Sequence, residues 1–85
     1  MKTETVTVDR SDGMDTRSIA LCVQTASRFR SEIHLTDGQR RMNAKSIMGM
    51  MALGLALGDE VTIETAGADE EEALQEMRRF FAEGI

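Results

Sequence analysis

The stretch DEVTIETAGADEEEALQEMRRFFAE, Asp59 to Glu83, carries two different hydrophobic periods on either side of a glycine. Before the glycine, Val61 and Ile63 alternate with polar residues, which predicts a strand with one buried face, and Thr65 continues the inward set. After the glycine, apolar residues recur every three or four positions, which predicts an amphipathic helix. The apolar residues of this helix are Ala73, Leu74, Met77, Phe80 and Phe81.

The start of this last helix, predicted over 69–83, is rich in acidic residues. Asp69 and Glu72 stand three residues apart, the spacing of a capping box, in which the first side chain accepts a hydrogen bond from a free helical amide. We therefore expect Asp69 to cap its own helix.

The same two periods recur through the rest of the chain and predict the remaining elements. These are a strand over 3–9, a helix over 15–30, a hairpin over 31–43 with its turn at Asp37–Gly38, a short helix between Ser46 and Gly54, and the strand over 59–67. The resulting order is βαββαβα. It predicts one domain over 1–85 of the α+β class, an open-faced sandwich with a four-stranded antiparallel sheet and three helices on one face.

Composition excludes several classes of function. The 85 residues carry a net charge of −5, which disfavours direct binding to nucleic acid. No apolar run is long enough to cross a membrane, so we expect a cytoplasmic protein without a membrane partner. The single cysteine, Cys22, lies in the apolar stripe of the first predicted helix, which predicts a small buried side chain and not a nucleophile.

Asp15 lies directly ahead of the first predicted helix, where a carboxylate can cap the first free amides. A second reading groups it with Asp9 and Asp12 as a cation site, but the alternating oxygen ligands and late glutamate of a calcium loop are missing. Acid–base catalysis would need a partner, and we expect no histidine, lysine or second placed carboxylate nearby. His34 alternates with apolar residues on a strand, so we place it on the outer sheet face. The sequence predicts no enzymatic activity, cofactor or metal.

The stretch NAKSIMGMMALG, Asn43 to Gly54, is nearly all apolar after its serine. A helix of about two turns buries only one face, so part of this set should face solvent as an adaptable, methionine-rich contact surface. The alternative is that all these residues pack inside a small core. Ser46 begins the helix, where free amides favour an anion, so it is either a plain cap or a phosphorylation site.

The runs NAKSIMG and VTIETAGADEEEAL, the βαββαβα order and the length resemble HPr, the phosphocarrier family of the bacterial sugar phosphotransferase system. The family's site segment reads roughly G-L-H-A-R-P-A, and its histidine relays phosphate from enzyme I. This chain has GMDTRSI at 13–19, so Asp15 stands at the histidine position and Ser18 at the proline position. The chain keeps Gly13, Arg17 and Ser46. It is therefore closest in kind to the Crh branch, the catabolite repression HPr-like proteins, which lack the histidine and carry glutamine there.

The resemblance implies a regulator that is phosphorylated on Ser46 by HPr kinase/phosphorylase. The phosphorylated form would then dock on a LacI-type regulator such as catabolite control protein A, with Arg17, Ile47, Met48 and Met51 in contact with it. Two alternatives stay open: a degenerate phosphocarrier that accepts phosphate on Asp15, and an unphosphorylated binding module that inhibits a metabolic enzyme.

The resemblance also implies that the first strand and the strand around Arg40 and Arg41 form the sheet edges. The two arginines guard one edge against further pairing, whereas the strand over 3–9 is unguarded and is followed by the hinge DRSDG. We therefore expect a strand-swapped homodimer in exchange with the monomer.

Overall fold

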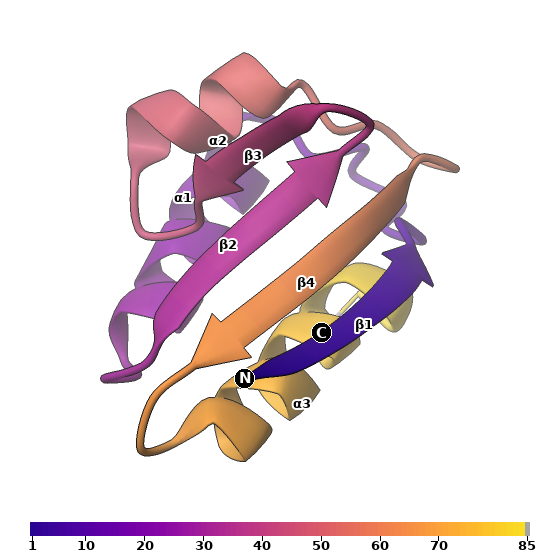
Figure 1. Cartoon of the computed structure of the whole chain (residues 1–85). Coiled ribbons are helices and arrows are strands. Elements are labelled where there is room, and N and C mark those ends of the chain that lie inside the picture. Colours follow the sequence, from indigo (N-terminus) through magenta and orange to yellow (C-terminus); the bar gives the residue numbers. More distant parts are fainter. Residues whose placement is uncertain (85) are drawn as a thin grey trace.

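The computed structural model describes residues 1–84 and contains the predicted seven elements in the predicted order (Figure 1). They are β1 (Lys2–Thr7), α1 (Thr16–Ser27), β2 (Glu32–Asp37), β3 (Arg40–Asn43), α2 (Ile47–Leu53), β4 (Glu60–Ala66) and α3 (Glu70–Ala82). The strands form one antiparallel sheet in the order β1-β4-β2-β3, so β1 and β3 are its edges. Helices α1 and α3 lie behind the sheet in Figure 1, and α2 packs against α1 and β3. The predicted α+β open-faced sandwich is confirmed.

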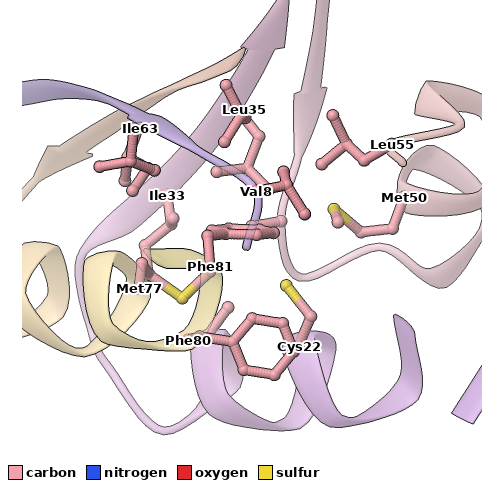
Figure 2. Packing of buried hydrophobic residues seen from close by; sticks show 14 of the residues in the cluster. Val8, Cys22, Ile33, Leu35, Met50, Leu55, Ile63, Met77, Phe80 and Phe81 are labelled. Atoms are coloured by element: carbon pink, nitrogen blue, oxygen red, sulfur yellow. The ribbon is translucent and has the colours of Figure 1, made fainter. Parts of the chain in front are cut away.

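The core lies between the sheet and the helices and is built from the predicted alternation. Val6 stands opposite Val61 and Leu35 opposite Ile63, and all four are buried. Figure 2 shows Phe81 and Met77 of α3 beneath Ile33, Leu35 and Ile63 of the strands, with Phe80 on the side of Cys22 and α1. Burial raises the pKa of the Cys22 thiol to about 12, so this cysteine is the inert core residue that its position predicts.

The opposite face of the sheet is polar. The hydroxyls of Thr5 on β1 and Thr62 on β4 are hydrogen-bonded at 2.8 Å. Arg41 of β3 reaches across β2 and donates to the Glu64 carboxylate of β4 at 3.2 Å. The hydrogen bond from Arg41 lowers the pKa of Glu64. His34 lies on this face between the inward Ile33 and Leu35, as predicted.

Two predicted boundaries are wrong by one or two residues. Asp37 pairs with Arg40, so the hairpin loop is Gly38–Gln39 and not Asp37–Gly38, with Gly38 in the left-handed region at φ 67°. Strand β1 ends at Thr7 because the pairing with β4 breaks just after it. Val8 N still donates to Asp59 O at 2.8 Å, but Val8 O accepts from Gly58 N at 2.9 Å and Asp9 N donates to Phe81 O at 2.8 Å.

The expected capping box at Asp69 is wrong. The Asp69 carboxylate makes no bond to its own helix and instead accepts from Arg30 N, Ser31 N and Ser31 Oγ at 2.9, 2.9 and 2.6 Å. Hydrogen bonds from the Ser31 hydroxyl and the Arg30 amide lower its pKa to about 2. Helix α1 ends at Ser27 and not near Arg30, because Arg28 N and Phe29 N donate to Thr25 O and Ala26 O in a tighter last turn, and Asp69 then binds the amides of 30 and 31.

The turn before α3 fits closely against this junction. A Cβ on Gly67 would lie 2.8 Å from the Cα of Ser31, and Gly67 has a φ of 148°, so only glycine fits here. The amide of Gly67 donates to the Glu70 carboxylate at 3.1 Å.

Each helix has a basic side chain from another element near its C-terminal end. Lys45 Nζ donates to Phe29 O just after α1 at 2.7 Å, Arg40 donates to Ala52 O in α2, and Arg10 Nη1 donates to Phe80 O in α3 at 2.9 Å. Unpaired carbonyls and the negative end of the dipole favour cations at these positions. The three contacts tie loops and strands to the helices that they cover.

Within residues 1–84, no helix has both the length and the apolar composition needed to span a membrane.

Candidate functional site

Ser46 caps α2, as the sequence predicts. Its hydroxyl oxygen accepts a hydrogen bond from Gly49 N at 3.1 Å, and its carbonyl accepts from Met50 N at 2.9 Å. The preceding turn is fixed by Asn43, whose side-chain oxygen accepts from Lys45 N at 2.8 Å and whose carbonyl accepts from Ser46 N at 3.0 Å. The backbone around the hydroxyl is therefore held in one conformation, and Ser46 itself is half-buried.

Helix α2 divides its apolar residues between the core and the solvent. Met50 and Leu53 are buried, with Met50 only 1% exposed, whereas Met48 is 79% exposed. Ile47 and Met51 are exposed beside Met48, and we call these three residues the α2 surface. The prediction that part of this helix faces solvent is confirmed, and the alternative in which every residue packs inside is wrong. Ser46 directly precedes the α2 surface.

Asp15 caps α1. Its carboxylate oxygen Oδ1 accepts from Ser18 N at 2.9 Å, and its carbonyl accepts from Ile19 N at 2.9 Å. The two residues before it, Gly13 and Met14, both have positive φ, at 63° and 58°. For Met14 this conformation is unfavourable, and it is kept because its side chain is buried in the core.

A second carboxylate lies beside this cap, which corrects the expectation that none would be placed near Asp15. Asp12 accepts hydrogen bonds from the Ser18 hydroxyl, from Met14 N at 3.2 Å and from Arg10 Nη2 at 3.0 Å. The bond from Arg10, followed by that from Ser18, lowers the pKa of Asp12 to about 2. Ser18 therefore contacts both carboxylates, donating its amide to Asp15 and its hydroxyl to Asp12.

Arg10 anchors this group to α3. Its side chain is almost fully buried, bonds to Asp12 and to Phe80 O, and places its guanidinium carbon 3.9 Å from the centre of the Phe80 ring. We call Arg10, Asp12 and Ser18 the α1 lock. The α1 lock is not predicted from the sequence, in which Asp12 resembles only a possible cation ligand and Arg10 is only part of the hinge DRSDG.

Two further features lie near the start of α1, an exposed arginine and a hollow. Arg17 is exposed in the first turn of α1. A shallow hollow of about 360 Å³ lies beside the α1 lock and is lined by Asp9, Arg10, Ser11, Asp12, Leu57, Glu83 and Gly84. Among residues 1–84 there is no group of three or more His, Cys, Asp or Glu side chains arranged to hold a metal ion.

Comparison with known proteins places this arrangement in a family. The family model described as "PTS HPr component phosphorylation site" matches residues 2–83. The chain belongs to the HPr family. Among HPr-family relatives, the HPr-like protein Crh of Bacillus subtilis is 40% identical over 85 residues, which cover 100% of both chains.

Solved structures of the HPr family share the fold. The phosphocarrier protein HPr of Bacillus anthracis superposes with a TM-score of 0.91 at 39% identity and covers 94% of this chain and 95% of its own. Crh of Bacillus subtilis, in a crystal structure described as a swapped dimer, gives a TM-score of 0.75 at 44% identity and covers 80% of this chain and 78% of its own. The resemblance to the HPr family, including its Crh branch, is thus confirmed.

Proposed function

We propose that this chain is a non-enzymatic regulator in carbon catabolite repression that acts in the cytoplasm. HPr kinase/phosphorylase phosphorylates Ser46, and the phosphorylated protein is the corepressor of a LacI-type regulator such as catabolite control protein A. The observation that carries the proposal is the position of Ser46, whose hydroxyl lies at the start of α2 directly before the exposed α2 surface. The similarity to Crh over the whole chain supports it.

Phosphorylation would change the surface and leave the fold in place. A phosphoryl group adds about 1.5 to 2 negative charges, and the free amides at the start of a helix favour such a charge. Ser46 already bonds Gly49 N, so the new oxygens replace a contact that exists. The result is an anion next to exposed apolar side chains. Arg17 is exposed in the first turn of α1, the helix that packs against α2, and we propose it as a polar anchor for the same partner.

A partner with a basic residue beside an apolar groove would recognise both parts of this surface. A charge-assisted contact contributes about 1.5 to 3 kcal/mol, which corresponds to a tenfold to hundredfold preference for the phosphorylated form. The apolar part adds affinity through Met51, Met48 and Ile47.

The proposal is tested by the affinity of kinase-treated and untreated protein for catabolite control protein A at fixed salt, because part of the interaction is electrostatic. Ser46→Ala should remove the difference between the two samples, and Met51→Ala and Arg17→Ala should weaken docking. Ser27→Ala, which removes an exposed serine at the end of α1, is the matched control and should still be phosphorylated. Equal affinity of the two forms, or no phosphorylation of Ser46, contradicts the proposal.

A phosphocarrier that uses Asp15 is the second candidate, favoured by the similarity to the phosphocarrier HPr of Bacillus anthracis. An acyl phosphate on Asp15 would alter the oxygens that now accept from Ser18 N and lie near the Asp12 carboxylate. We therefore expect no label on the chain after incubation with enzyme I and labelled phosphoenolpyruvate. Label on Asp15 would favour the carrier.

A third candidate is a binding module that uses the α2 surface without phosphorylation to inhibit a metabolic enzyme. The exposure of Met48 and Met51 supports this candidate as much as it supports the phosphorylated regulator, since the exposure of these side chains does not depend on Ser46. The candidate predicts that Ser46→Ala leaves partner binding unchanged while Met51→Ala reduces it.

The proposal includes a strand-swapped homodimer in which β1 is exchanged between two chains. The swapped dimer of Bacillus subtilis Crh supports it, as does the position of β1 at a sheet edge. The contacts of Val8 and Asp9 with Asp59 and Phe81 lie at the hinge and hold the closed monomer. Light scattering coupled to size exclusion should show a monomer and a dimer that exchange slowly, and a monomer at all concentrations contradicts this part.

A further inference from the structure

The methionines of this chain fall into two groups by exposure. Met14, Met50 and Met77 are buried, and Met42 is half-buried against the core. Met1, Met48 and Met51 are exposed, and the last two lie three residues apart on α2, so they share one side of the helix. The α2 surface therefore has two of its three side chains in the one apolar type that can be oxidised reversibly.

We propose that Met48 and Met51 are a modification site: their oxidation by a peroxide to methionine sulfoxide weakens partner docking, and reduction restores it. The inference rests on the proposed function, because it concerns the same surface. It adds a second covalent control to that surface, one that acts on its apolar part and not on its charge.

The chemistry requires only the thioether and a peroxide. The sulfur lone pair attacks one peroxide oxygen, the O–O bond breaks, and a sulfur–oxygen bond forms. The second oxygen leaves with a proton as water, so the sulfur loses two electrons and the peroxide gains them. Methionine sulfoxide reductases reverse the step at the expense of thiols, one enzyme for each sulfoxide epimer.

Solvent access makes the reaction selective. Met48 and Met51 are 79% and 51% exposed, whereas Met50 and Met77 are 1% and 0% exposed and would need local unfolding to meet the oxidant. A sulfoxide at 48 or 51 faces solvent, so the core packing does not change. A polar sulfoxide in an apolar groove loses most of the contact that the thioether makes, and we expect roughly tenfold weaker docking.

The charge at Ser46 is untouched by this oxidation. The preference for the phosphorylated form should therefore persist after oxidation, with both affinities lowered by the same factor. This outcome distinguishes loss of apolar contact from a disordered α2, in which the preference would disappear with the cap.

The first experiment follows oxidation of the full chain by hydrogen peroxide, with peptide mass spectrometry of each methionine over time. Met48 and Met51 should gain one oxygen at least ten times faster than Met50 and Met77, and circular dichroism should stay unchanged. Equal rates for the exposed and buried methionines would overturn the proposal without any bearing on the proposed function.

The second experiment compares affinity for the regulator before and after peroxide treatment, in the phosphorylated chain and in a phosphorylated Met48→Leu/Met51→Leu chain. The ratio of the two affinities is measured within each protein, so a different starting affinity of the variant does not matter. The ratio should be about ten for the natural sequence and about one for the variant. Because Met1 is oxidised in both proteins, the variant also controls for that residue.

The outcomes separate the two proposals. If the phosphorylated, unoxidised chain binds the regulator and peroxide leaves its affinity unchanged, or lowers that of the leucine variant equally, only the oxidation switch is wrong. If the phosphorylated, unoxidised chain does not bind, the proposed function fails and the switch fails with it. Treatment with methionine sulfoxide reductases A and B should return the oxidised chain to its first affinity, and no recovery overturns reversibility.

Discussion

Helices α1 and α2 begin with the same type of cap but differ in everything around it. Asp15 accepts from Ser18 N at 2.9 Å, and Ser46 accepts from Gly49 N at 3.1 Å. Behind Asp15 lies the α1 lock, in which buried Arg10 bonds Asp12 and α3. After Ser46 lies an exposed apolar surface. The polar groups of the α1 lock are therefore bonded to one another and to α3, whereas an exposed apolar surface follows the α2 cap, which is why we propose the regulatory role for α2.

Among tests of this difference between the starts of α1 and α2, Arg10→Met should have the largest effect on stability. The substitution keeps much of the side-chain volume but removes the bonds to Asp12 and Phe80 O and the contact with the Phe80 ring. We expect the free energy of unfolding to fall by about 3 kcal/mol in urea denaturation, because a buried charged partner is lost. Arg17→Met, at the exposed start of α1, is the control and should change it by less than about 0.5 kcal/mol. If Arg10→Met changes the free energy of unfolding as little as Arg17→Met does, the bonds of the α1 lock do not stabilise the fold.

The next test uses acid. The pKa of Asp12 is about 2 in the folded protein, below the ordinary value, so its ionised form stabilises the fold above about pH 4. That stabilisation is lost as the pH falls toward 2. Asp12→Asn should lower the free energy of unfolding by about 1 to 2 kcal/mol at pH 6.

The difference between Asp12→Asn and the natural sequence should then shrink steadily between pH 4 and pH 2, measured by thermal melts in low-salt buffers. The Asp69 carboxylate, whose pKa is also about 2, loses its charge over the same interval in both proteins and does not affect the difference. A difference that stays constant down to pH 2 contradicts the role of the Asp12 charge.

The smallest expected effect on stability comes from removing the two cap side chains, Asp15 and Ser46. Asp15→Ala and Ser46→Ala each remove one cap hydrogen bond and should lower the free energy of unfolding by about 1 kcal/mol or less. Of these two substitutions, only Ser46→Ala should change binding to the regulator in the proposed function. If Asp15→Ala reduces binding as strongly as Ser46→Ala, the starts of α1 and α2 are not functionally distinct.

The sequence predicts what depends on neighbours along the chain. The caps at Asp15 and Ser46, the inward positions of Val61 and Ile63, and the order of the seven elements follow from periodicity and from residues three or four positions apart. These features are local, so a single sequence contains the signal for them.

The features that the sequence did not predict join distant segments. Asp69 looks like a local cap but bonds Ser31, which is 38 residues away. Arg10 reaches Phe80 across 70 residues, and neither contact leaves a spacing pattern. The sequence contains only a weak signal for the α1 lock. Arg10 follows the inward alternation of Val6 and Val8 and stands two positions before Asp12.

The buried thiol of Cys22 gives this chain a built-in reporter. It lies in α1 facing α3, and a pKa of about 12 leaves almost no thiolate at neutral pH, so an alkylating reagent reacts only with molecules in which α1 has opened. The rate of alkylation therefore measures how often this part of the fold opens in its native buffer, with no label introduced. If the proposed dimer forms, the alkylation rates of separated monomer and dimer can be compared at the same residue, since an exchange of β1 leaves Cys22 in α1.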